Sequence, residues 1–115
     1  MTPTKALLFR FSALTFNAHL IHLDPHYAQT TEGHQNILVH GPLTVVLMLS
    51  FLSNHLSKLG LRVKDIEYRN LVPLHVDEEL RICAKATKTS GQWGVWIEGP
   101  QGSLAARGTA WAAPI

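Results

Sequence analysis

The sequence predicts an α+β fold in which one long central helix is wrapped by a curved antiparallel sheet of about five strands. Three observations lead to this prediction: one strongly apolar helical segment precedes residue 60, only strand-like patterns follow it, and the chain has just 115 residues. Hydrophobic residues make up 46% of the chain and charged residues 16%, which is typical of a globular protein. We therefore expect residues 1–115 to form a single domain.

The central helix is expected to begin at Gly41 and Pro42, because proline suits the first helical position. Apolar residues follow around much of the circumference as far as Leu56, so we expect the helix to be buried on most sides. Gly60 provides a stop signal. The apolar run is too short to span a bilayer, and we expect no association with a membrane.

The remaining elements are assigned from their periodicity. Lys5 to Leu14 is interpreted as a first strand, and Thr15 to Asn36 as a loop with short helical turns because it has no clean period. Alternating patterns separated by turn residues then predict an antiparallel meander of four strands, over residues 63–71, 80–87, 93–97 and 104–112. One helix wrapped by such a sheet is the arrangement known as the hot-dog fold.

Charge and cysteine content limit the function classes. The formal net charge is only +2 and the basic residues are scattered, which argues against nucleic-acid binding, although a few could meet a phosphate-bearing handle. Cys83 is the only cysteine and is expected to be an ordinary strand residue. Together with the absence of a secretory signal pattern, it favours an intracellular, cytoplasmic protein. A mitochondrial location is the alternative, because no acidic residue precedes Asp24.

Two segments carry the chemistry: SALTFNAHLIHLD, from Ser12 to Asp24, and VHGPL, from Val39 to Leu43. Together they resemble the family of MaoC-like dehydratases and (R)-specific enoyl-CoA hydratases, in particular its branch of type 2 hydroxyacyl-thioester dehydratases and mesaconyl-CoA-type hydratases. The resemblance implies that Asn17 and His22 are the catalytic pair. Asn17 stands where the wider family has Asp, and an amide cannot exchange a proton as a carboxylate does. Proton transfer would then fall largely to His22.

The resemblance also implies a substrate and a mechanism. The substrate would be a β-hydroxyacyl or enoyl thioester of CoA or of an acyl carrier protein. The Gly41 amide at the helix entrance would stabilise enolate charge, and His40 and His19 would order or line the site. No metal or other cofactor is expected. Because relatives in this branch often carry two hot-dog halves, this chain corresponds to the catalytic half and is expected to pair as a homodimer.

Three alternatives stay open at this stage. A metal site could use the cluster of His19, His22, Asp24 and His26, although its spacing matches no familiar zinc pattern. A hot-dog thioesterase would need a carboxylate, and the nearest acids, Asp24 and Glu32, do not stand at the helix entrance. The third alternative is a non-catalytic acyl-binding or partner subunit.

Overall fold

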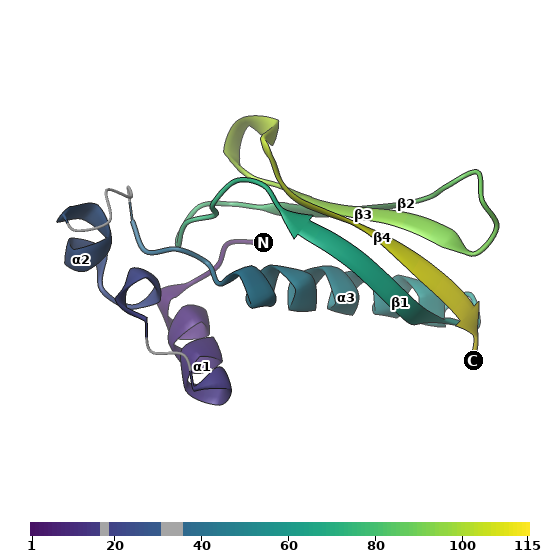
Figure 1. Ribbon diagram of the computed structural model, residues 1–115, viewed down its shortest axis with the longest axis horizontal. Helices are drawn as coiled ribbons and strands as arrows, with labels where there is room; N and C mark the ends of the chain where they lie inside the picture. Colours follow the sequence, from purple (N-terminus) through teal and green to yellow (C-terminus); the bar gives the residue numbers. More distant parts are fainter. Residues whose placement is uncertain (17–18, 31–35) are drawn as a thin grey trace.

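The computed structural model of the protein describes residues 1–16, 19–30 and 36–115. Its main body is a long helix, α3 (Gly41–Ser57), lying along one face of a curved antiparallel sheet (Figure 1). Three smaller helical elements, α1 (Lys5–Thr15), η1 (Leu20–His22) and α2 (Pro25–Thr30), gather beyond the N-terminal end of α3. The predicted α+β architecture with one long central helix is confirmed.

The sheet does not have the simple meander order that we predicted. Its strands are β1 (Leu61–Asn70), β2 (Arg81–Ala86), β3 (Gln92–Glu98) and β4 (Leu104–Pro114), and their order within the described residues is β1-β4-β3-β2. Only β2, β3 and β4 form a meander, whereas β1 pairs with β4 from the other side. The short 3-10 turn η2 (Pro100–Gly102) joins β3 to β4.

The connection between β1 and β2 explains this order. Residues 71–80 do not turn back on β1 but run beside the segment that precedes α3. Val39 N donates to Leu74 O at 2.8 Å, and Val76 N donates to Ile37 O at 3.0 Å. These bonds lead the chain across the end of α3, so that β2 enters at the opposite edge of the sheet from β1.

The segment that we predicted to be the first strand is instead the helix α1. Thr4 caps its start, and the Thr4 hydroxyl oxygen accepts a hydrogen bond from Leu7 N at 3.1 Å. Leu8 and Ser12, four residues apart, form its buried side. The pattern of Leu, Phe and Ala fits a strand as well as a helix, and the cap with the four-residue spacing decides in favour of the helix. The sheet therefore has four strands among the described residues rather than about five.

The core lies between α3 and the inner face of the sheet. Its α3 side is a stripe at four-residue spacing, made by Thr44, Met48, Leu52 and Leu56. The opposite side of α3 is open, with Val46 45% exposed, so the prediction of a helix buried on most sides is wrong for the single chain. No helix in the described ranges has the length and apolar character needed to cross a membrane.

Candidate active site

His22 is held at the end of η1 by bonds to the segment before α3. Leu38 N donates to Ile21 O at 2.7 Å, and His22 Nδ1 lies 2.8 Å from Leu38 O. A carbonyl oxygen only accepts, so Nδ1 carries the proton and donates it to Leu38 O. In the neutral ring, Nε2 therefore keeps a lone pair that is available to accept a proton.

His40 lies directly against His22. The two rings are stacked with centroids 3.9 Å apart and planes 17° apart, and Phe11 meets His40 edge-on at 4.8 Å. His40 is fully buried, and its Nε2 lies 2.7 Å from the Ser12 hydroxyl oxygen on α1. His40 Nδ1 has no hydrogen-bond partner among the described residues. His40 thus forms a fixed flat surface behind His22.

Burial sets the protonation of this ring pair. Burial lowers the pKa of His22, the bond to the Leu38 carbonyl opposes this shift, and the charge of His19 adds to it. Burial, followed by the charge of His22, lowers the pKa of His40 to about 4. His40 is therefore neutral near pH 7, and the lowered pKa of His22 favours the neutral form of that ring as well.

The entrance of α3 faces the same space as His22. The Gly41 amide has no hydrogen-bond acceptor among the described residues, and Pro42 has no N–H, so Gly41 offers a free backbone donor where the helix begins. The Thr44 hydroxyl donates to Gly41 O at 2.5 Å and lies 2.7 Å from Asn70 Oδ1 at the end of β1. A Cβ at position 41 would meet Asn70 Nδ2 at 2.9 Å, so only glycine leaves this contact undisturbed.

A hollow of about 380 Å³ brings these groups together. Its polar wall is made by His22, Gly41, Thr44 and Asn70, and residues 71–74 with Ile21, Leu38 and Val39 form the apolar remainder. No carboxylate is part of this lining within the described ranges. An apolar hollow with a histidine base and a free backbone amide suits a neutral acyl group whose carbonyl develops negative charge.

The sequence-predicted site residues separate into groups. His22 and Gly41 meet at the hollow, whereas His40 supports His22 from behind and is absent from the lining. His19 is exposed, with its ring centroid 6.2 Å from that of His22, and its Nδ1 accepts a bond from Ile21 N at 3.2 Å. Asn17, like Glu32 and His34, lies outside the described residues, so its assignment stays a prediction.

The alternative metal cluster does not assemble. Asp24 instead caps α2, because its Oδ1 accepts bonds from His26 N at 3.0 Å and Tyr27 N at 3.3 Å. No three ligand-type side chains in the described part of the chain are grouped for a metal ion.

Sequence reasoning missed Ser12, Thr44 and Asn70. For Ser12, the one local indication of burial was its position four residues after Leu8, on the same side of a helix.

Solved structures with the same architecture identify the fold. The chain superposes on "(R)-hydratase from A. caviae involved in PHA biosynthesis" with a TM-score of 0.83, at 24% identity, covering 100% of this chain and 90% of that one. It also matches R-hydratase PhaJ1 from Pseudomonas aeruginosa with a TM-score of 0.81, at 19% identity, covering 99% and 76%. At these identities the likeness establishes the fold, which is the hot-dog fold.

Sequence comparison identifies the family. The model of hydroxyacyl-thioester dehydratase type 2 matches residues 1–76, and the chain belongs to this family. The mitochondrial type 2 dehydratase of Schizosaccharomyces pombe is 38% identical over 97 residues, covering 84% of this chain and 31% of that protein. Mesaconyl-C(4)-CoA hydratase of Chloroflexus aurantiacus is 38% identical over 109 residues, covering 95% and 37%. The chain thus spans about a third of the length of these curated relatives.

Proposed function

We propose that the protein is a hydro-lyase that adds water to an enoyl thioester or removes it from a β-hydroxyacyl thioester. The observation that carries this proposal is that two groups line the same hollow. One is His22, whose Nε2 has a lone pair that can accept a proton, and the other is Gly41, whose amide can donate a hydrogen bond. The names of the curated relatives, a hydroxyacyl-thioester dehydratase and a mesaconyl-CoA hydratase, agree with this reaction class.

The geometry suggests how hydration would proceed. The thioester carbonyl oxygen would accept a hydrogen bond from the Gly41 amide, which stabilises the enolate that forms when the β-carbon is attacked. His22 Nε2 would take a proton from the attacking water while its Nδ1–H stays on Leu38 O. The imidazolium would then return the proton to the α-carbon, which completes the addition of one water molecule. Asn17 would orient that water.

A thioesterase is the second candidate, because the fold is shared with a hypothetical thioesterase from Streptococcus pneumoniae, which matches with a TM-score of 0.58. Such an enzyme needs a group that activates water for attack on the carbonyl carbon. The described lining of the hollow offers a histidine and an amide side chain but no carboxylate. We therefore favour hydration over hydrolysis.

Assembly and location belong to the same proposal. The open side of α3, with Val46 exposed, leaves apolar surface that a second hot-dog domain would cover. We propose that this domain is a second copy of the chain, which would make the protein a homodimer. We also propose a cytoplasmic location. The related type 2 dehydratases of Schizosaccharomyces pombe and Saccharomyces cerevisiae are named as mitochondrial, which makes that compartment the alternative.

The decisive experiment follows the loss of enoyl absorbance when crotonyl-CoA is incubated with the wild type, His22→Ala, Asn17→Ala and His26→Gln. We expect His22→Ala to lose at least about 100-fold in kcat. Exposed His26 is the matched control, because its ring has no contact with the hollow, and His26→Gln should retain activity. Unchanged turnover in His22→Ala would refute the assignment of the base. Release of free thiol without loss of the double bond would favour the thioesterase.

A further inference from the structure

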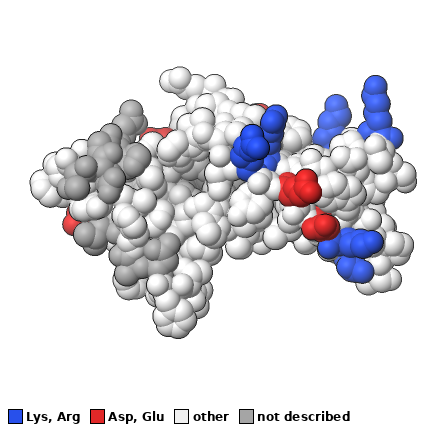
Figure 2. Space-filling model, in the orientation of Figure 1, with Lys and Arg blue, Asp and Glu red and all other residues white. Residues whose placement is uncertain are grey.

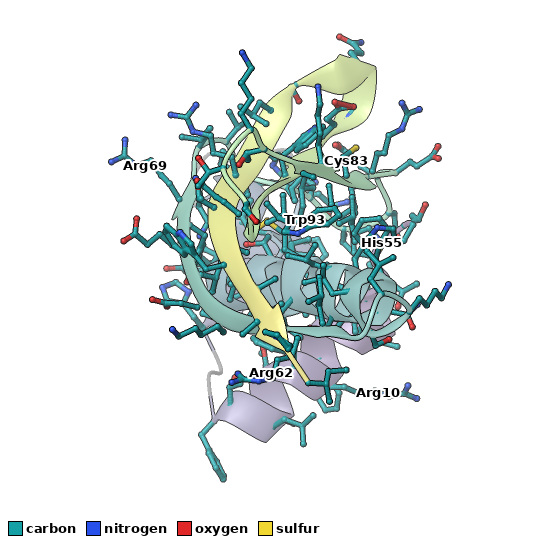
Figure 3. The ribbon with its side chains drawn as sticks, turned by 90° about the vertical axis from the view of Figure 1, so that its right-hand side faces the viewer. Arg10, His55, Arg62, Arg69, Cys83 and Trp93 are labelled. Atoms are coloured by element: carbon teal, nitrogen blue, oxygen red, sulfur yellow. The ribbon has the colours of Figure 1, made fainter. Side chains whose placement is uncertain are left out.

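Two arginines lie directly opposite each other on the outer face of the sheet. Arg69 of β1 is paired with Arg107 of β4 in the antiparallel register, and both side chains are exposed. Their neighbours Asn70 and Ala106 face inward, toward α3 and the core, which leaves the arginines on the other side. Figure 3 shows Arg69 projecting outward from the edge of the sheet.

This pairing is electrostatically unfavourable in the protein alone. Like charges directly opposite each other on a sheet destabilise it. Neither arginine is within ion-pair distance of a carboxylate in the part of the chain that the structure describes. In Figure 2 one group of basic side chains lies near the middle of the face, and the others lie toward its right-hand side. An anion bound between the two guanidinium groups would remove the repulsion and accept paired hydrogen bonds from each.

The surface around the pair is shaped to receive a ligand. A hollow of about 460 Å³ is lined by both arginines together with Tyr68, Thr109, Gly108 and Glu67. The charged residues of this lining are Arg69, Arg107 and Glu67, so the hollow has a net positive charge. Trp96 of β3 is the next residue across the sheet from Arg107, and the two line an adjoining hollow of about 350 Å³. A cation pair beside an aromatic ring suits a phosphorylated nucleotide.

The arginine pair is also close to the candidate active site along the chain. Arg69 immediately precedes Asn70, which contacts Thr44 and lines the hollow of His22. Leu71 and Val72 continue this edge and line the same hollow, and they are 41% and 48% exposed. Residues 69–72 thus run around the end of β1 and connect the outer arginine pair with the hollow of His22.

We propose that Arg69 and Arg107 form an anion subsite for the phosphate groups of the thioester carrier, with Leu71 and Val72 beneath its flexible arm. The subsite rests on the proposed function, since the thioester would occupy the hollow of His22. Phosphate occurs in coenzyme A and also in the phosphopantetheine arm of a carrier protein. Trp96 favours coenzyme A, because only that carrier ends in a purine ring.

The test compares thioesters that share one acyl group but differ in the phosphate-bearing part of the carrier. Steady-state hydration is measured with crotonyl-CoA, crotonyl-phosphopantetheine and crotonyl-N-acetylcysteamine, which has no phosphate. We expect Arg69→Gln and Arg107→Gln each to raise KM for crotonyl-CoA about three- to tenfold, with kcat unchanged. KM for the N-acetylcysteamine thioester should not move. Arg62→Gln, at the other end of β1, removes the same charge and should leave all three KM values unchanged.

The two carrier sources give different patterns. A higher KM for crotonyl-CoA alone places the nucleotide phosphates on the arginines. An equal rise with crotonyl-phosphopantetheine places there the phosphate that both carriers share. The double variant combines Arg69→Gln with Arg107→Gln. If its KM for both phosphorylated substrates is unchanged, the subsite is refuted. An equal rise in KM for the phosphate-free thioester would refute it as well. Thermal unfolding of each variant checks that the sheet is intact.

Failure of the proposed reaction can be separated from failure of the subsite. If the wild type hydrates none of the three thioesters, the hydro-lyase proposal fails, and calorimetric titration with coenzyme A and with pantetheine then tests the arginines alone. Coenzyme A should bind the wild type and bind the double variant at least about tenfold more weakly, while pantetheine should not distinguish them. Equal binding of coenzyme A to both proteins, or to neither, refutes the subsite.

Discussion

The hydrogen bond between Ser12 and His40 offers the sharpest test of how the site is supported. The Ser12 hydroxyl oxygen lies 2.7 Å from His40 Nε2, and both side chains are buried. His40 Nδ1 already has no partner among the described residues, so Ser12→Ala would leave this imidazole without any hydrogen bond. A buried polar group that loses its partner costs about 1–3 kcal/mol in the free energy of unfolding. For a domain of this size, each 1 kcal/mol lowers Tm by about 3–6 °C.

A double-mutant cycle isolates this bond from other effects of the serine. Urea unfolding is followed by circular dichroism for the wild type, Ser12→Ala, His40→Phe and the double variant. Phenylalanine keeps a flat ring against His22 and Phe11 but has no nitrogen to satisfy, so Ser12→Ala should cost about 1 kcal/mol less in that background. Exposed Ser50 is the matched control, and Ser50→Ala should stay within about 0.5 kcal/mol of the wild type. Equal costs of Ser12→Ala in both backgrounds would refute the reasoning.

Three further predictions follow from the ring pair and the helix entrance. Burial lowers the pKa of His22, and its neutral ring is the proposed base, so kcat/KM should rise with pH through an inflection below 6.5 and then level off. An inflection above 6.5 in the pH–rate profile would contradict this. The unfolded chain binds a proton at His40 near pH 6.5 and the folded chain only at about 4, so the free energy of unfolding should fall as the pH drops between these values. His40→Phe should flatten this fall in urea midpoints measured across the range. Gly41→Ala should lower kcat at least about tenfold, because the added Cβ displaces Asn70 and turns the entrance amide; combining it with Asn70→Ala should restore part of the rate.

The sequence was sufficient for those parts of the site that depend on local pattern. Gly41 and Pro42 predicted the helix start, and the structure begins α3 at Gly41. The placing of His22 beside that start could not come from periodicity, and it depended on the resemblance of the two motifs. The strand prediction for Lys5 to Leu14 was wrong because a short run of Leu, Phe and Ala has no period that separates the two structures.

The supporting residues could not be predicted because their partners are distant in the chain. Ser12 and His40 are 28 residues apart, and Thr44 and Asn70 are 26 apart. Both contacts arise because segments from α1 and β1 converge on the first turn of α3. A polar residue in an apolar pattern indicates that a partner is needed but not which residue supplies it.

In the proposed mechanism one histidine, His22, serves as both base and acid, and its stacking on His40 supports this double role. At a centroid distance of 3.9 Å, two charged imidazoles would repel each other strongly, and the charge of His22 does lower the pKa of His40. His40 would therefore stay neutral when His22 takes a proton from water in the proposed reaction. The Leu38 carbonyl accepts a hydrogen bond from His22 Nδ1 and favours the protonated ring, so it would stabilise the imidazolium until the proton is transferred to the substrate. Because Asn17 cannot carry a proton, this arrangement would keep the transferred proton on His22 in the proposed reaction.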